Sequence, residues 1–551
     1  MSTAEPGFKE AYIVMETRVI IIACYFIVVL VIGFIARTSW RSTPDEYFLA
    51  GRRLGGLVLL GTMAATNFSA FTVFGASGAG YRDGYAFFPV IGFGTGFMAL
   101  TFWLIGKKVW ELGKANNLIT PSELVNTVYG SRPLSLLFAA VMIVFTIPYL
   151  ALQPMAGGYI LHQLFSIPQA AGAAIITLAI VIYIFRGGLR AVTWTDVFQG
   201  LLMVALMITA LLLVVRYYGG FSAANEAVRQ IRPELMARPG GEGRFGPALW
   251  FSFIMLWFFC DPMFPQLFQR FFSARNTEAI KSTMLFYPLV CTVVFILPVT
   301  LGVLGHLSVP GLTGKEADQI LLLMLRQTCG DFMGTLIMTA GLAALMSTMD
   351  SQLLTLSSIF MRDIYPLAAR DKVQSSLPGK VFVIILAGLG LLFAINPSST
   401  IIQIATQAFT GLAVLFPAVL FGLYARKPNP TAAFVSIIVG ETLVALSHFH
   451  LIPTGNFLPA VPIIAATFMA YIVIAGIQSM RSLAFSLPSG RTIIFSAGFV
   501  VIFVMAIDWW QWRASTPTIF GFPYWMGYFV LLSAIQTVLM KWWVRDKVKG
   551  R

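Results

Sequence analysis

Long apolar stretches separated by short polar connectors run along the whole chain. A helix needs about 20 apolar residues to cross a bilayer, and by that measure the pattern predicts an all-α polytopic membrane protein with about 15 spans. The expected spans lie near residues 16–36, 54–80, 84–106, 134–163, 169–187, 190–216, 248–271, 282–306, 333–361, 378–396, 398–425, 429–448, 456–479, 491–510 and 519–541.

The connectors between these spans carry a charge bias. If the N-terminus is outside and the spans alternate, most of the 37 Lys and Arg residues fall in inside connectors, including Arg190, Arg270 and Arg275. Because cytoplasmic connectors are enriched in Lys and Arg, the bias predicts a cell-membrane protein whose basic C-terminal tail is in the cytoplasm.

Composition supports this class. Hydrophobic residues make up 58% of the chain and charged residues 11%, whereas soluble domains carry about 25% charged residues. The basic residues behind the net charge of +14 lie in the connectors. The sequence has no basic stripe interleaved with aromatic residues, so a nucleic-acid partner is not expected. The expected partner of the surface is the lipid bilayer.

Two of the expected spans contain poor helix formers at their middles. The first has the run Thr62–Thr72, and the second has Pro262 and Pro265 beside Asp261. Proline removes a backbone donor and clashes with the preceding helical turn, so these prolines either interrupt the helix or kink a packed one. Interrupted segments at matching places in two halves of a transporter mark its solute site. Here they begin two blocks of five spans, 54–216 and 248–425, which the odd helix number would make inverted in the membrane.

Carboxylates and hydroxyls stand inside apolar helices at two places. Asp196 lies in one expected span, and the run Ala343–Leu354 packs Ser347, Thr348, Asp350 and Ser351 into about one and a half helical turns. An intramembrane carboxylate usually faces a wet cavity, an ion or a partner. Because these groups offer hard oxygen ligands, the chain is interpreted as an ion-coupled transporter.

These stretches resemble the sodium:solute symporter family, which includes sodium-coupled sugar, proline, pantothenate and monocarboxylate carriers. The resemblance covers about residues 16–425. It rests on Asp45–Arg52, Ala65–Phe68, Gly187–Gln199, Gln269–Arg270 with Ala274–Arg275, and Ala343–Leu354. It implies a leucine-transporter-type core of ten helices in a 5+5 inverted repeat and sodium-driven uptake by alternating access.

The resemblance also implies a sodium site. Its ligands would be the backbone carbonyls of Ala65, Phe68 and Ala344 and the hydroxyls of Ser347 and Thr348. Positions 344, 347 and 348 share one helix face, and a break at 65–68 frees carbonyls. The two hydroxyls have an alternative, because Ser and Thr also bond to carbonyls of their own helix.

Some family members hold a second sodium, which here would involve Asp196, Ser347, Asp350 and Ser351. Asp350 replaces a hydroxyl residue of those members, and two neighbouring carboxylates either bind a cation more strongly or force one of them to take a proton. A second sodium, a coupled proton, and a salt bridge from Asp350 to an inside arginine such as Arg190 all fit the sequence.

The candidate solute-binding residues are Asn67, Gln153, Trp257, Asp261 and Gln407. No Lys or Arg lies at the middle of an expected span, and Phe68, Phe71, Phe264 and Phe268 make the region apolar. A sugar wants many side-chain hydrogen bonds, whereas an anion can be held by freed backbone N–H groups, helix dipoles and the sodium ion. The pattern favours a small carboxylate as the solute.

The chain therefore divides into an N-terminal helix and loop (1–53), a transport core (54–425), and four C-terminal helices with a basic tail (426–551). The expected function is sodium-coupled symport with no organic cofactor. A proton-coupled carrier on the same fold and a membrane solute sensor are the alternatives. Paired catalytic groups and metal-ligand spacings are not recognisable in the sequence, so an enzyme is not expected.

Overall fold

The computed structural model describes residues 6–36, 43–184, 188–241, 243, 245–368, 377–397, 399–449, 451–452, 454–478 and 490–545. In these ranges twelve helices are long and apolar enough to cross a membrane, and two bent helix pairs raise that number to fourteen. The protein is a helical bundle with one two-stranded hairpin among its described residues.

The helices of the first half are α1 (Pro6–Ile35), α2 (Pro44–Leu49), α3 (Gly56–Asn67), α4 (Ala76–Asp83), α5 (Gly94–Phe97), α6 (Lys107–Asn116), α7 (Pro121–Tyr129), α8 (Arg132–Phe165), α9 (Gln169–Ile184), α10 (Gly188–Tyr217) and α11 (Phe221–Ile231). The remaining elements are α12 (Pro247–Cys260), α13 (Pro265–Ser273), α14 (Thr277–Leu304), α15 (Ile320–Thr328), α16 (Gly330–Ile359), α17 (Tyr365–Ala368), α18 (Leu377–Ile395), α19 (Ile401–Ala413), α20 (Phe416–Tyr424), α21 (Pro430–His448), α22 (Ala460–Gln478), α23 (Gly490–Ile507), β1 (Thr518–Ile519), β2 (Phe522–Pro523) and α24 (Tyr524–Arg545).

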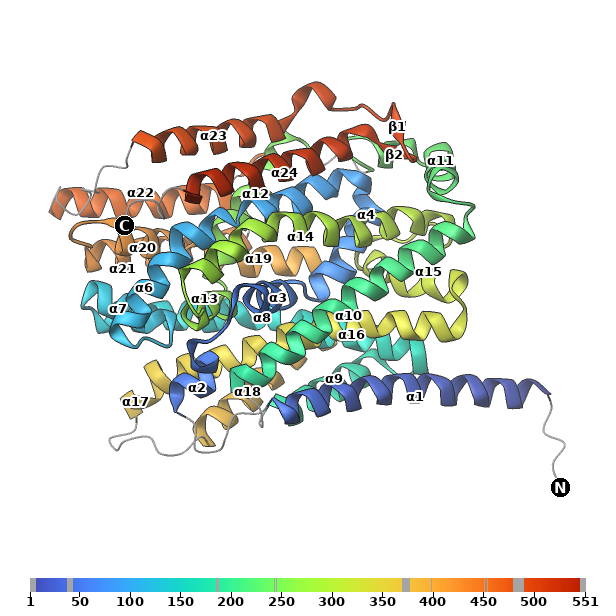
Figure 1. Ribbon diagram of the computed structural model, residues 1–551, viewed down its shortest axis with the longest axis horizontal. Helices are drawn as coiled ribbons and strands as arrows, with labels where there is room; N and C mark the ends of the chain where they lie inside the picture. The colour runs from blue at the N-terminus through green and yellow to red at the C-terminus, as the bar shows by residue number, and fades with distance from the viewer. Residues whose placement is uncertain are drawn as a thin grey trace.

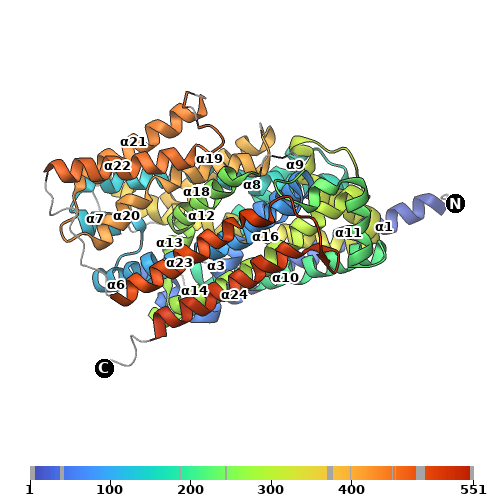
Figure 2. The ribbon, with the colours of Figure 1, turned by 90° about the horizontal axis from the view of Figure 1, so that it is seen from above.

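Each predicted span contains a helix, which confirms the all-α polytopic class. The match is imperfect at α9, which has only 16 residues, so the number of fifteen spans stays a prediction. The start of α1 and the end of α24 lie at opposite ends of the bundle (Figures 1 and 2). Which end is cytoplasmic also stays a prediction, and the basic residues Lys547, Lys549 and Arg551 lie outside the described residues, as does Gly187.

Both interrupted spans are broken in the structure. Helix α3 ends at Asn67, where Phe68 has a non-helical backbone (φ −84°, ψ 86°), and the chain turns by 63° before it continues through residues 71–86. Helices α12 and α13 meet at 53°, at the predicted prolines Pro262 and Pro265. Irregular backbone in a membrane must be buried in protein or line a cavity, and the residues of both breaks are buried.

The helices around the breaks pack in two contiguous groups. Helix α10 lies along α16, and α8 packs against α9, α18 and α19. In the second group, α14 packs against α3, α4 and α24. Figures 1 and 2 show α23 and α24 running side by side along one flank of the bundle. The broken helices therefore lie inside the bundle, with α16 against α3 and α13.

Candidate ion and solute sites

Two hydroxyls of α16 contact the last turn of α3. Ser347 Oγ donates to the carbonyl oxygen of Ala65 at 2.9 Å, and Thr348 Oγ1 donates to that of Thr66 at 3.0 Å. The same hydroxyls lie 3.1 and 3.2 Å from the carbonyl oxygen of Ala344 in their own helix. Each hydroxyl therefore contacts a carbonyl of its own helix and a carbonyl of the α3 break at the same time. The hydroxyl and carbonyl oxygens of α16 and the carbonyl oxygens of α3 lie close together.

The structure thus brings together four of the five predicted sodium-binding residues: Ala65, Ala344, Ser347 and Thr348. The fifth, Phe68, is the first residue beyond α3, and its N–H donates to the Ala64 carbonyl at 2.8 Å. Sequence reasoning did not include the carbonyl of Thr66. The spacing does indicate this carbonyl. Ser347 and Thr348 are consecutive residues of α16, and the carbonyls that they contact belong to the consecutive residues Ala65 and Thr66 of α3.

A second polar cluster surrounds Asp196 of α10. Asp196 Oδ2 accepts hydrogen bonds from Thr62 Oγ1 at 2.5 Å and Thr66 Oγ1 at 3.1 Å, both on α3. Ser351 of α16 joins the cluster through its Oγ, which lies 3.2 Å from Thr66 Oγ1. Asp196 and Ser351 are fully buried, so two of the four predicted second-site residues lie together beside the α3–α16 contact.

Arg270, which the charge pattern assigns to a connector, lies in α13 and is the partner of Asp196. Its Nη2 lies 2.7 Å from Asp196 Oδ2 and 2.7 Å from Ser351 Oγ. Its Nε donates to Thr62 Oγ1 at 2.8 Å. Neither side chain of the ion pair is exposed. Charged residues of membrane-spanning helices usually pair with one another, and Arg270, near the end of α13, forms such a buried pair with Asp196.

Asp350 lies on another side of α16. It is fully buried and within electrostatic range of Tyr25 of α1. The hydroxyl of Tyr25 accepts a hydrogen bond from Gln199 at 2.9 Å and contacts the sulfur of Met346, one turn before Asp350. Arg190, the partner suggested by the sequence, is exposed. Asp350 therefore lies near the contact between α16 and α1.

The two helix breaks are joined by the candidate solute-binding residues. Asn67 Nδ2 donates to the hydroxyl of Tyr287 at 2.7 Å and lies 3.5 Å from Asp261 Oδ2. On the opposite side of the α3 break, Gln153 Oε1 accepts the N–H of Ala70 at 3.1 Å. The structure therefore places Asn67, Gln153 and Asp261 around the same two breaks.

An aromatic group covers these polar residues. The ring of Trp257 lies 5.7 Å from that of Phe71 and 5.6 Å from that of Phe409. Tyr149 and Phe264 complete the group at 4.9 and 4.8 Å from Phe409. Trp257 thus belongs to an apolar layer beside the breaks, and no hydrogen-bond partner of its indole nitrogen is found among the described residues.

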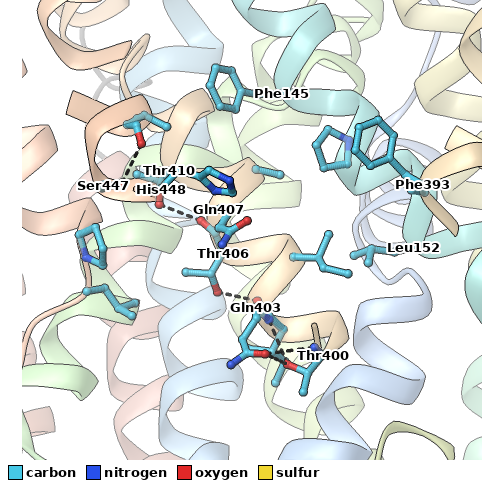
Figure 3. A pocket seen from close by; sticks show the side chains of 18 of the residues that line it. Phe145, Leu152, Phe393, Thr400, Gln403, Thr406, Gln407, Thr410, Ser447 and His448 are labelled. Carbon is cyan, nitrogen blue, oxygen red and sulfur yellow. Dashed lines mark hydrogen bonds between the residues drawn. The ribbon is translucent and has the colours of Figure 1, made fainter. Parts of the chain in front are cut away.

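Gln407 lies in a separate place. It is exposed in a cavity of about 1420 Å³ between α8, α19 and α21, shown in Figure 3. Gln403, Thr406 and Thr410 of α19 line the same cavity, and Phe145 and Leu152 of α8 form an apolar wall. The cavity meets the aromatic group at Phe253, whose ring lies 5.6 Å from that of Trp257.

Arg82, which also lines this cavity, forms an ion pair. Arg82, at the end of α4, lies 3.0 Å from Asp318 in the loop before α15. Asp318 also accepts the N–H of Ile401 at 2.8 Å, at the start of α19. Burial raises the pKa of the Asp318 carboxyl above its usual range, and the charge of Arg82 opposes that rise. The loop is thereby fixed to both α4 and α19.

The profile of the sodium:solute symporter family matches residues 47–440. The chain belongs to the sodium:solute symporter family. The sodium/pantothenate symporter of Escherichia coli is 30% identical over 469 residues, covering 83% of this chain and 96% of that protein. The sodium/proline symporter of the same organism is 26% identical, covering 78% of this chain and 88% of the relative. This member of the family is therefore a multi-pass cell-membrane symporter, coupled to sodium, and not an enzyme.

Solved structures support the fold. A sodium-coupled sialic acid symporter, in a substrate-bound outward-open state, aligns with a TM-score of 0.71 at 18% identity over 84% of this chain and 98% of the other. A transporter of the nucleobase-cation-symport-1 family aligns with a TM-score of 0.54 at 14% identity, over 82% and 98% of the two chains. The symporter therefore shares its fold with these two transporters.

Proposed function

We propose that this symporter couples one sodium ion to uptake of a small organic carboxylate by alternating access, and that the sodium ion binds between α3 and α16. The observation that carries the sodium site is the convergence of the Ser347 and Thr348 hydroxyls on the carbonyls at the α3 break. Five uncharged oxygens, from Ala65, Phe68, Ala344, Ser347 and Thr348, suit a monovalent cation that must be released in each cycle. A cation there would replace the hydroxyl-to-carbonyl bonds that now join the same atoms.

A small carboxylate fits the neighbouring space. The two breaks offer a few polar groups, on Asn67, Gln153 and Asp261, inside an aromatic surround. Half-helices that start at such breaks direct their positive dipole ends toward an anionic solute. Both compared relatives are sodium symporters, of pantothenate and of proline, and each of these solutes carries a carboxylate. Trp257 and Gln407 would meet the solute on its way to the breaks.

Residues 54–425 would form the transport core, with inverted halves 54–216 and 248–425. Residues 1–53 and 426–551 would be additions to it, with the N-terminus outside and the C-terminus inside. The two breaks at corresponding positions, in α3–α4 and α12–α13, support this division.

The test is uptake by the purified full-length protein in liposomes under an imposed sodium gradient. Labelled pantothenate, proline, pyruvate, acetate and a hexose serve as solutes. The variant Ser347→Ala/Thr348→Ala removes both hydroxyl ligands. Its matched control is Thr335→Ala/Thr339→Ala, because those two hydroxyls lie on the same helix and donate to carbonyls of their own helix.

The proposal expects uptake of one carboxylate that needs sodium, fails in the first double variant and survives in the control. Sodium-independent uptake that follows a pH gradient would instead favour a proton-coupled carrier. Solute binding without any uptake would favour a membrane sensor. Sodium-driven uptake of the hexose alone would reject the carboxylate.

A further inference from the structure

Arg270 makes four hydrogen bonds that join four segments of the fold. Besides Asp196, Ser351 and Thr62, its guanidinium donates from Nη1 to the Gln266 carbonyl of its own helix at 2.9 Å. The three side chains it contacts come from α10, α16 and α3. Arginine presents its N–H groups in a rigid fork and keeps its charge in every environment, so this residue acts as a fixed cation inside the bundle.

The contacts of Arg270 are with the oxygens that a second alkali ion would need. Asp196 Oδ2 receives Arg270, Thr62 and Thr66, and Ser351 Oγ receives Arg270. Among the oxygens that Arg270 and its neighbours Thr62 and Thr66 contact or flank, Asp196 Oδ1 keeps no hydrogen-bond partner in the described part of the chain. Hard cations take several oxygen ligands at once, and one oxygen is too few. A sodium ion at this place would also meet the positive charge of Arg270, and two like charges repel strongly in a buried place.

We propose that the guanidinium of Arg270 takes the place of a second coupling ion at Asp196, so that this symporter binds a single sodium ion. The inference rests on the proposed function, since it presupposes that the first sodium site lies between α3 and α16. Arg270 is a positioning residue: it neutralises Asp196 and thereby decides the number of ions without contacting the solute.

Helix α13, which carries Arg270, is also held in place by contacts on both sides of the Asp196–Arg270 pair. Figure 1 shows α13 beside α3, and α13 also packs against α16 and α6. Close to the ion pair, Gln269 of α13 bonds to Thr355 and Ser358 of α16 at 2.7 and 2.9 Å. Beyond it, the N–H of Leu54 donates to the Ser273 carbonyl at 3.2 Å and the N–H of Arg275 donates to the Leu54 carbonyl at 2.9 Å. Arg270 therefore lies within the set of contacts that holds this end of the broken helices against α16.

The experiment counts sodium ions without using a solute. Radioactive sodium binding is measured at equilibrium on the purified full-length protein, in the wild type, Arg270→Gln, Asp196→Asn, and Asp196→Asn/Arg270→Gln. Size-exclusion profiles report which variants are folded. Arg275→Gln is the matched control, because Arg275 follows in the same segment but its side chain is exposed. Ser347→Ala/Thr348→Ala reports on the first site separately.

The proposal expects about one sodium per protein and a Hill coefficient near one in the wild type, Arg275→Gln and the charge-neutral double variant, since cooperativity cannot exceed the number of sites. In Arg270→Gln, Asp196 is released and binding rises to about two ions per protein with a Hill coefficient above one. If that variant does not fold, the comparison of wild type with Asp196→Asn decides, because the proposal expects the same count in both.

Two results overturn the inference. One is a wild type that binds two ions and loses one of them in Asp196→Asn. The other is a folded Arg270→Gln protein that still binds a single ion. Failure of the proposed function gives a different result, namely sodium binding in the wild type that Ser347→Ala/Thr348→Ala leaves unchanged, or no sodium binding at all.

Discussion

Thr348 offers the sharpest test at the level of a single residue. Its hydroxyl contacts the Thr66 carbonyl and the Ala344 carbonyl in a buried place. Valine has the same shape without the oxygen, and loss of a buried polar partner costs about 1–3 kcal/mol. A loss of about 1.4 kcal/mol is tenfold in affinity. We therefore expect Thr348→Val to raise the sodium concentration for half-maximal uptake about tenfold, whereas Thr348→Ser stays within a factor of a few.

Sodium titrations of uptake in liposomes measure this effect. Equal half-maximal concentrations in the valine and serine variants would show that the hydroxyl only packs between α3 and α16.

The residues around the first site could be predicted from the sequence because their spacing is local. Ala344, Ser347 and Thr348 share a helix face whatever the rest of the fold does. Arg270 could not be located in this way. It follows Gln269 in a short segment next to a connector, and only the contacts with α3, α10 and α16, far away in the chain, decide that it is buried. The one local signal was the flanking apolar run of Phe268, Phe271 and Phe272, which is typical of a buried helix.

At the level of elements, α4 and α14 approach each other more closely than ordinary side chains allow. A Cβ atom added to Gly302 would lie 2.0 Å from the carbonyl oxygen of Ser77, which is main chain and cannot turn aside. Overpacking of this kind typically costs about 1–3 kcal/mol. We expect Gly302→Ala to lower the melting temperature of the purified protein by several degrees.

Gly388→Ala in α18 is the control, because nothing lies within 4 Å of its added Cβ. Alanine is a better helix former than glycine by about 1 kcal/mol, so this variant should keep or raise the melting temperature. A Gly302→Ala protein as stable as Gly388→Ala would mean that α4 and α14 separate easily.

The positions of the two breaks could be predicted, because proline and clustered small polar residues disrupt a helix wherever they occur. The irregular course of residues 89–116 could not. This span contains π-helical segments at Pro89–Phe93 and Phe102–Gly106, although the sequence predicts a regular helix near 84–106. Gly94, Gly96 and Gly106 are approached at close range by Ile254, Pro288 and Phe271, so packing with distant segments shapes the helix here.

At the level of the whole molecule, the last two helices contact the rest of the protein in two ways, through side chains along α24 and through the loop between α11 and α12. Ser533 of α24 bonds to Thr292 of α14 at 2.9 Å, and Gln536 donates to the Gly96 carbonyl at 3.0 Å. The sequence predicted these helices but not what they contact, because the contacts join residues more than 200 positions apart. Helix α24 therefore packs against α14 and α5, and α14 in turn packs against the broken helix α3–α4.

The loop-level attachment is a buried ion pair. Arg238, in the loop between α11 and α12, bonds to both carboxylate oxygens of Asp508, just after α23. Its guanidinium also lies 4.8 Å from the ring of Trp512, 4.9 Å from that of Trp525 and 5.5 Å from that of Phe529. The pair is almost completely buried, at 1% and 0% exposure. Five side chains thus fasten the loop to α23, α24 and the segment between them.

This arrangement predicts how the C-terminal helices respond to mutation. Removing one partner of a buried pair costs about 3–5 kcal/mol, because the other charge stays buried without compensation, whereas replacing both by apolar residues is often neutral. We expect Arg238→Met to lower the melting temperature and to make residues 509–523 sensitive to protease, and Arg238→Met/Asp508→Leu to restore most of both. Arg232→Ala is the control, since its pair with Glu234 is about 40% exposed and such pairs contribute at most about 1 kcal/mol. A double variant no more stable than Arg238→Met would mean that the aromatic contacts of Arg238, not its charge pair, hold the loop on α23 and α24.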